Sequence, residues 1–176
     1  RKTTRTVAFF EKMLRDKKVF YAAPGPSGDY DRDGKLDFFL ASWWPEADSL
    51  LLHNETPGGH WLDVALECDG RDAQSNGDLQ KQPSGQTGTN RQGIGSIVRI
   101  YKWGWLGDPK ALLGSAEIML GYGYVSSHMA DAHFGLGSVE KVDVEVTLPH
   151  GRGKLTRTNV NADQRLVIWQ SKPDPK

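Results

Sequence analysis

The residues with the clearest chemical potential form an acidic loop at residues 29–37, which reads Asp-Tyr-Asp-Arg-Asp-Gly-Lys-Leu-Asp. Ca²⁺ takes about six to eight oxygen ligands, and a chain that curls at Gly34 brings alternating carboxylates to one point. The sequence therefore predicts a calcium site in this acidic loop, with a solvated acidic turn as the alternative. The predicted ligands are Asp29, Asp31, Asp33, Lys35 through its carbonyl, and Asp37.

Tryptophan is the second source of candidate chemistry, because flat aromatic rings stack on the apolar faces of sugar rings. The chain contains six tryptophans. Four lie at strand ends or in loops and are candidate ligand-binding residues: Trp43, Trp44, Trp103 and Trp105. They would equally serve packing between domains or docking onto a partner protein, where tryptophan is enriched. Trp61 and Trp169 lie within predicted strands and are expected in the core.

Sequence motifs give little support for an enzyme. The chain has no Gly-x-Ser-x-Gly, His-Glu-x-x-His, Walker loop or dinucleotide fingerprint. His128, Asp131 and His133 form one conceivable acid–base or metal trio, but a packed, hydrogen-bonded His133 is the expected alternative. Asp143 and Glu145 alternate with valines, which predicts that both lie on a solvated strand face. No catalytic residue is assigned, and we predict a non-catalytic protein.

Short apolar runs separated by Gly, Pro and Asn turns predict a mainly β fold, and the high counts of glycine (20) and proline (9) agree. A short amphipathic helix is expected at residues 6–18, and a long polar loop at 69–92. Gly135 and Gly137 predict a tight turn around Leu136. The predicted strands cover residues 38–44, 49–53, 60–67, 94–101, 112–120, 142–148, 154–160 and 165–169. We predict an antiparallel β-sandwich or barrel, preceded by the helix and by a propeller-blade-like hairpin that carries the acidic loop.

Composition excludes several classes of protein. The 176 residues (19.5 kDa) suffice for one medium domain, or one domain with part of a second. Lys and Arg (22) balance Asp and Glu (22), so the basic surplus of a nucleic-acid binder is missing. No apolar run approaches the roughly 20 residues that span a bilayer. The single cysteine, Cys68, rules out an internal disulfide and a cysteine-based metal cluster.

Two parts of the sequence resemble known families. The acidic loop, the apolar run after it and a second strand that ends at Asn54 resemble one FG-GAP or VCBS calcium-binding repeat of integrin-type propellers. Several further motifs follow in order, at residues 59–66, 90–100, 121–127, 132–137, 142–149 and 161–166. Together these motifs resemble the ASPIC/UnbV module of secreted bacterial proteins and cartilage acidic proteins, over roughly residues 58–170.

The resemblance implies three regions: a helix and calcium-loop repeat at 1–57, a β module at 58–170 and a flexible tail at 171–176. It implies a secreted protein, extracellular or periplasmic, that binds calcium and acts in adhesion or carbohydrate recognition. The expected partner is a polysaccharide or glycan, or another protein, but not a nucleic acid. The alternative is a structural or accessory subunit of a larger assembly, with an enzyme as a distant third.

Overall fold

A computed structural model gives the fold of the chain. It describes residues 12, 16, 22–23, 25–42, 48–68, 89–121 and 126–170. Three predicted features fall outside these residues: the helix at 6–18 apart from Lys12 and Asp16, the loop at 69–88, and the tail at 171–176. The chain divides into two compact units, Arg1–Thr56 with Gly121–His128, and Pro57–Leu120 with Met129–Lys176.

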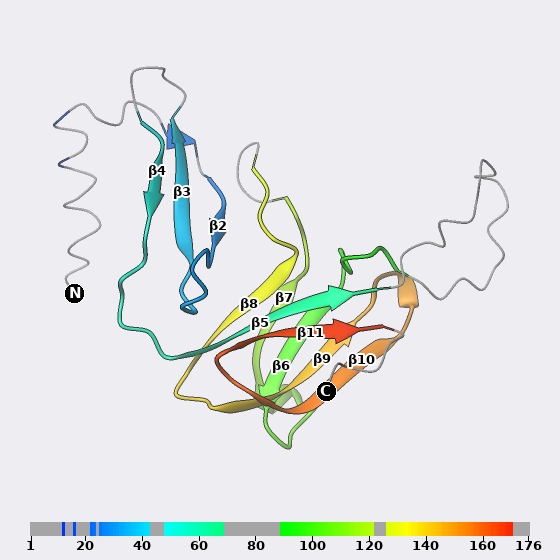
Figure 1. The fold of residues 1–176 in the computed structure, drawn as a ribbon. Helices are drawn as coiled ribbons and strands as arrows, with labels where there is room; N and C mark the ends of the chain where they lie inside the picture. The colour runs from blue at the N-terminus through cyan, green and yellow to red at the C-terminus, as the bar shows by residue number, and fades with distance from the viewer. Residues whose placement is uncertain are drawn as a thin grey trace, which may run out of the picture. The chain divides into compact units, whose positions relative to one another are not determined.

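The first unit is built on an antiparallel sheet with β3 (Asp37–Ser42) as the strand that pairs with all others (Figure 1). The partners of β3 are β1 (Ala22–Ala23), β2 (Ser27–Gly28) and β4 (Leu50–Leu52). Gly28 pairs with Asp37, so the acidic loop connects two paired strands. This pairing fixes both ends of the loop and leaves its middle free to curl.

The second unit contains two open sheets. The first has the order β10 (Lys154–Asn161), β9 (Lys141–Thr147), β6 (Ile97–Lys102), β7 (Leu112–Glu117). The second has the order β11 (Gln164–Trp169), β5 (His60–Glu67), β8 (Asp131–Gly137). All pairs are antiparallel except β5 with β11, which is parallel and departs from the antiparallel prediction. Single 3₁₀ turns lie at η1 (Pro109–Ala111) and η2 (Pro149–Gly151).

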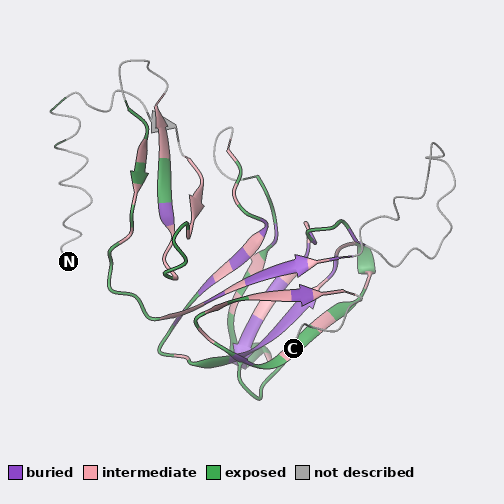
Figure 2. Cartoon of the chain, in the orientation of Figure 1, coloured by how far each residue is buried: buried purple, intermediate pink, exposed green. Residues whose placement is uncertain are grey.

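Both sheets of the second unit contribute to one hydrophobic core, as Figure 2 shows by the buried residues along the strands. Alternate residues of each strand point inward, so β5, β6 and β9 each present an apolar face. Fully buried core residues include Leu62, Val64, Val98, Val144 and Ile168. The prediction of a mainly β fold is confirmed. Among the described elements, no helix has the length and apolarity needed to cross a membrane.

Strand β8 corrects the predicted tight turn around Leu136. Gly135 lies inside β8, opposite Trp61, and Gly137 ends the strand with a φ of 62°. Glycine is depleted in strands, and the two glycines therefore suggested a turn. The inward alternation of Ala132, Phe134 and Leu136, all buried, is the signal that identifies the strand.

Candidate functional site

The acidic loop of the first unit closes on itself through its own backbone. Gly34 has a φ of 87°, in the left-handed region that favours glycine, so the predicted curl is present. The Asp29 carboxylate accepts the N–H groups of Asp33 (3.0 Å) and Gly34 (2.8 Å). Asp33 in turn accepts from the Lys35 N–H (2.9 Å) and Nζ (2.5 Å). This Lys35 side-chain bond holds the pKa of Asp33 below its ordinary value of 3.8. Asp29, Asp31 and Asp33 keep one carboxylate oxygen each within 4.8 Å of one another.

The predicted ligands Asp31 and Asp37 also meet a residue that the sequence did not nominate, His53. Its Nδ1 lies 3.3 Å from Asp37 Oδ1 and 3.6 Å from Asp31 Oδ2. Asp37 is 2% exposed, and its Oδ1 accepts the N–H of Asn54 at 2.7 Å. Its Oδ2 is buried without a hydrogen-bond partner. A buried carboxylate oxygen without a partner is unfavourable, and a bound cation would offset this cost.

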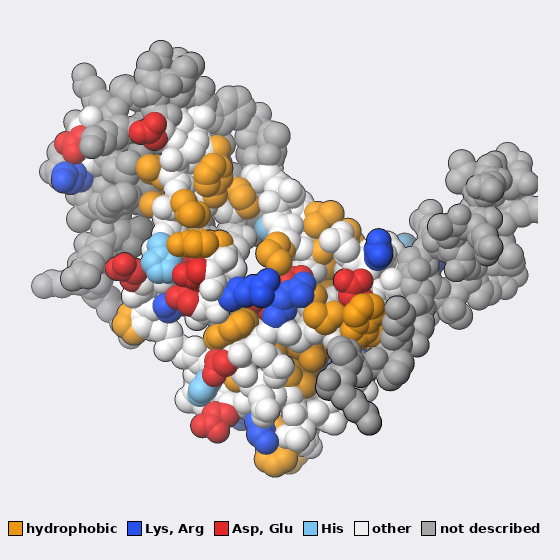
Figure 3. Space-filling view, in the orientation of Figure 1, with side chains coloured by type: hydrophobic (Ala, Val, Ile, Leu, Met, Phe, Trp, Pro, Cys, Tyr) orange, Lys and Arg blue, Asp and Glu red, His pale blue; other side chains and the backbone are white. Residues whose placement is uncertain are grey.

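Negative charge dominates the surroundings of the acidic loop. Its four carboxylates are opposed within the loop by Arg32 and Lys35 alone. Partial burial, and then the loop carboxylates with Asp31 first, raise the pKa of Tyr30 above its ordinary value of 10.0. Figure 3 shows acidic side chains gathered around a histidine on one face of this unit. The electrostatics therefore favour a cation.

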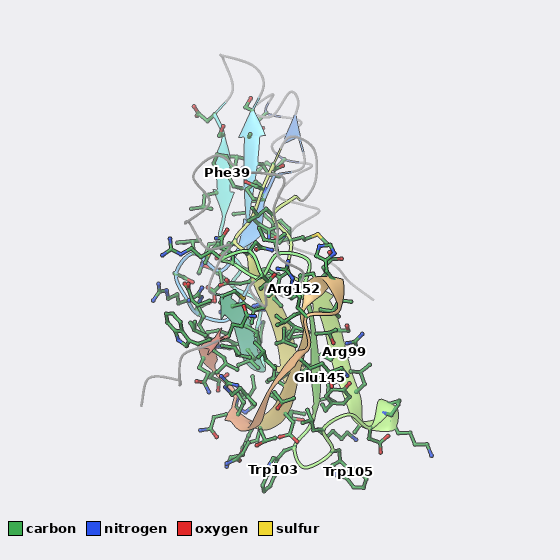
Figure 4. The ribbon with its side chains drawn as sticks, turned by 90° about the vertical axis from the view of Figure 1, so that its right-hand side faces the viewer. Phe39, Arg99, Trp103, Trp105, Glu145 and Arg152 are labelled. Carbon is green, nitrogen blue, oxygen red and sulfur yellow. The ribbon has the colours of Figure 1, made fainter. Side chains whose placement is uncertain are left out.

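The second candidate site is a tryptophan loop at residues 102–111, between β6 and β7 of the second unit. Trp103 and Trp105 are each 59% exposed, and Figure 4 shows both side chains projecting away from the strands. The loop is nevertheless ordered by its own turns. The Trp105 N–H donates to the Lys102 carbonyl (3.0 Å), and the Asp108 N–H donates to the Trp105 carbonyl (3.1 Å). These two hydrogen bonds fix the backbone that carries the exposed tryptophans.

Asp143 of β9 fixes the tryptophan loop to the sheet. It is 2% exposed; its Oδ2 accepts the Gly104 N–H (2.8 Å) and its Oδ1 accepts the Asn159 N–H (2.9 Å). The prediction that Asp143 and Glu145 lie on a solvated face is therefore wrong. Glu145 is 8% exposed and bonds Lys154 Nζ at 3.0 Å. A loop turned back onto the strand and long neighbouring side chains exclude water from both acids.

Polar groups border one of the two exposed rings. Lys141 Nζ lies 5.5 Å from the centre of the Trp103 ring, a cation–π arrangement, and donates to Asn159 Oδ1 at 3.2 Å. Lys141 therefore lies over one face of the ring; the opposite face can stack on a sugar ring, whose hydroxyls polar side chains can bind. Two further predicted ligand-binding residues, Trp43 and Trp44, lie outside the described residues.

The proposed trio of His128, Asp131 and His133 does not form a metal-binding group in the described part of the chain. Asp131 accepts two hydrogen bonds from Arg165, at 2.7 and 3.1 Å, and this bonding raises the pKa of Arg165. His133 Nδ1 lies 2.7 Å from Asp63 Oδ1. His133 is thus the packed, hydrogen-bonded residue of the alternative interpretation.

Comparison with protein families gives one result, and it concerns the second unit. The sequence model described as ASPIC and UnbV matches residues 86–175, slightly more than half of the chain. The chain belongs to the ASPIC and UnbV family. No curated protein and no solved structure matches it. The ASPIC and UnbV match contains the tryptophan loop and six of the strands, from β6 to β11.

The compact unit that contains most of the ASPIC and UnbV match also includes residues that precede it. Strand β5 (His60–Glu67) precedes the match, yet it is the middle strand of the sheet that β8 and β11 complete. The acidic loop also precedes the match. The two candidate sites therefore belong to different parts of the sequence, and each must be argued from its own residues.

Proposed function

We propose that this chain is a non-catalytic module that recognises carbohydrate through the tryptophan loop. The observation that carries the proposal is the exposure of Trp103 and Trp105, 59% each, on a loop fixed by the buried Asp143. A binding surface that is ordered before the ligand arrives loses less conformational entropy on binding. Lys141, whose Nζ lies over the Trp103 ring, and its hydrogen-bond partner Asn159 supply polar groups next to this tryptophan.

A second candidate function, docking as an accessory subunit of a larger assembly, has its own supporting observation. Leu106 in the loop and Leu112 and Leu113 at the start of β7 are 36%, 42% and 38% exposed. Exposed apolar side chains near exposed tryptophans can mark a contact with another protein. The carbohydrate proposal has the stronger support because polar groups accompany the aromatic ring.

We further propose that the acidic loop is a repeat of the FG-GAP or VCBS type and holds Ca²⁺. The buried, unpartnered Asp37 Oδ2 fits such an ion, as does the concentration of carboxylates. Asp29, Asp31, Asp33, Asp37 and the Lys35 carbonyl would hold it, and the ion would neutralise their repulsion and tie the loop to β3. The family resemblance supports a secreted, extracellular or periplasmic location.

The test is a polysaccharide pull-down and glycan array with the full chain, in calcium and in chelator. Trp103→Ala and Trp105→Ala should each weaken binding roughly tenfold or more, a loss of about 1.4 kcal/mol. Phe38→Ala is the matched control, since Phe38 is an aromatic residue 50% exposed on β3. A folded chain that binds no polysaccharide, or equal losses in all three variants, would overturn the proposal.

A further inference from the structure

His53 differs from the other histidines that meet carboxylates. His60 Nδ1 lies 2.7 Å from Asp163 Oδ2, and His133 Nδ1 lies 2.7 Å from Asp63 Oδ1. Both distances are those of short, charge-assisted hydrogen bonds. His53 Nδ1 instead lies at 3.3 and 3.6 Å from the carboxylates of two separate aspartates. It therefore faces two acids without closing on either, and the Tyr30 hydroxyl lies 3.4 Å from the same nitrogen.

This spacing suits three ligands of one metal ion. A first-row metal with bonds of about 2.0–2.2 Å holds neighbouring ligand atoms roughly 3.0–3.5 Å apart. The two distances from His53 Nδ1 are close to this range, and one donor atom each of Asp31, Asp37 and His53 lies within 4.8 Å of the others. A second, independent observation is the Asp37 Oδ2 atom, which is buried and has no hydrogen-bond partner.

We infer that Asp31, Asp37 and His53 form a mixed carboxylate and imidazole site for a first-row divalent metal such as Mn²⁺ or Zn²⁺. Imidazole favours such metals, whereas Ca²⁺ prefers oxygen ligands alone. The inference rests on the proposed binding of a cation by the acidic loop. It keeps Asp31 and Asp37 as ligands and adds His53 in place of the other oxygen ligands. Both carboxylate oxygens of Asp29 and of Asp33 already accept hydrogen bonds within the loop, whereas Asp31 and Asp37 accept backbone N–H groups through Oδ1 alone. His53 brings a further ligand from the residue after β4. The metal would thus join the loop to β4.

The experiment is a titration of the full chain with Mn²⁺, followed by electron paramagnetic resonance of the free ion, and with Ca²⁺ by calorimetry. Electron spin-echo modulation of bound Mn²⁺ then reports whether a nitrogen is a direct ligand. We expect nitrogen modulation in the parent chain and none in His53→Gln. We also expect His53→Gln to weaken Mn²⁺ roughly tenfold or more and Ca²⁺ less than about twofold.

Two further variants make the result specific. Asp31→Asn removes a ligand shared by both ligand sets and should weaken both ions. His150→Gln is the matched control, because His150 is an exposed histidine in η2 of the second unit, and it should change neither affinity. Ca²⁺ binding with no nitrogen signal and no effect of His53→Gln would overturn this inference and leave the calcium proposal standing. A chain that binds neither ion would overturn both.

Discussion

Substitution of Asp143 by alanine tests whether this buried acid holds the tryptophan loop. The change removes hydrogen bonds to Gly104 N–H (2.8 Å) and Asn159 N–H (2.9 Å). A hydrogen bond to a charged group contributes about 1.5–3 kcal/mol, and the abandoned N–H groups carry their own desolvation cost. Water can reach the exposed loop end in the variant and recover part of the loss. We therefore expect the free energy of unfolding to fall by about 3 kcal/mol.

Urea unfolding of the full chain, followed by circular dichroism, measures this loss. Acrylamide quenching of tryptophan fluorescence and the polysaccharide pull-down then report on the loop under native conditions. We expect weaker polysaccharide binding in Asp143→Ala even though Trp103 and Trp105 are unchanged. Glu117→Ala is the control, because Glu117 is an exposed acid on β7 of the same sheet; it should change stability by less than about 0.5 kcal/mol.

Asp143→Asn separates the two hydrogen bonds. The asparagine oxygen can still accept one N–H, but its NH₂ group would face the other N–H donor. The free energy of unfolding of Asp143→Asn should therefore lie between those of the parent and of Asp143→Ala. A fall of less than about 1 kcal/mol in the free energy of unfolding of Asp143→Ala would refute the argument that Asp143 orders this site. Unchanged polysaccharide affinity in a variant whose tryptophans are quenched more readily by acrylamide would refute it as well.

Two further predictions concern the second unit. A Cβ atom on Gly93 would lie 2.4 Å from Leu66 Cδ1 at a φ of 66°, so Gly93→Ala should cost about 2–4 kcal/mol in urea unfolding, and a loss below about 1 kcal/mol would contradict this. Hydrogen bonding from His60 holds the pKa of Asp163 below its ordinary value of 3.8, so the stability it adds is complete above that pH and fades as pH falls through the lowered pKa. The difference in urea midpoint between the parent and Asp163→Asn should therefore shrink as the pH falls below about 4, and a difference that stays constant would count against the pair.

The sequence predicted the strands with local signals and missed what depends on distant pairing. Residues 60–67 alternate clearly and form β5 with the predicted bounds. Strand β8 was missed because Gly135 and Gly137 outweighed the alternation around them. The parallel pairing of β5 with β11 joins Leu62 to Gln164, and no local pattern records which distant strand a given strand meets.

The two candidate sites show the same division in chemical terms. The acidic loop could be predicted because Asp29 to Asp37 are adjacent in sequence and Gly34 permits their curl. His53 could not, because only the pairing of β3 with β4 brings it to Asp37. Period-two alternation correctly gave Asp143 the face opposite the valines, but alternation reports direction and not exposure. A loop that turns back over the strand makes that outward face dry, and the acid it buries then supplies the acceptors that order the tryptophans.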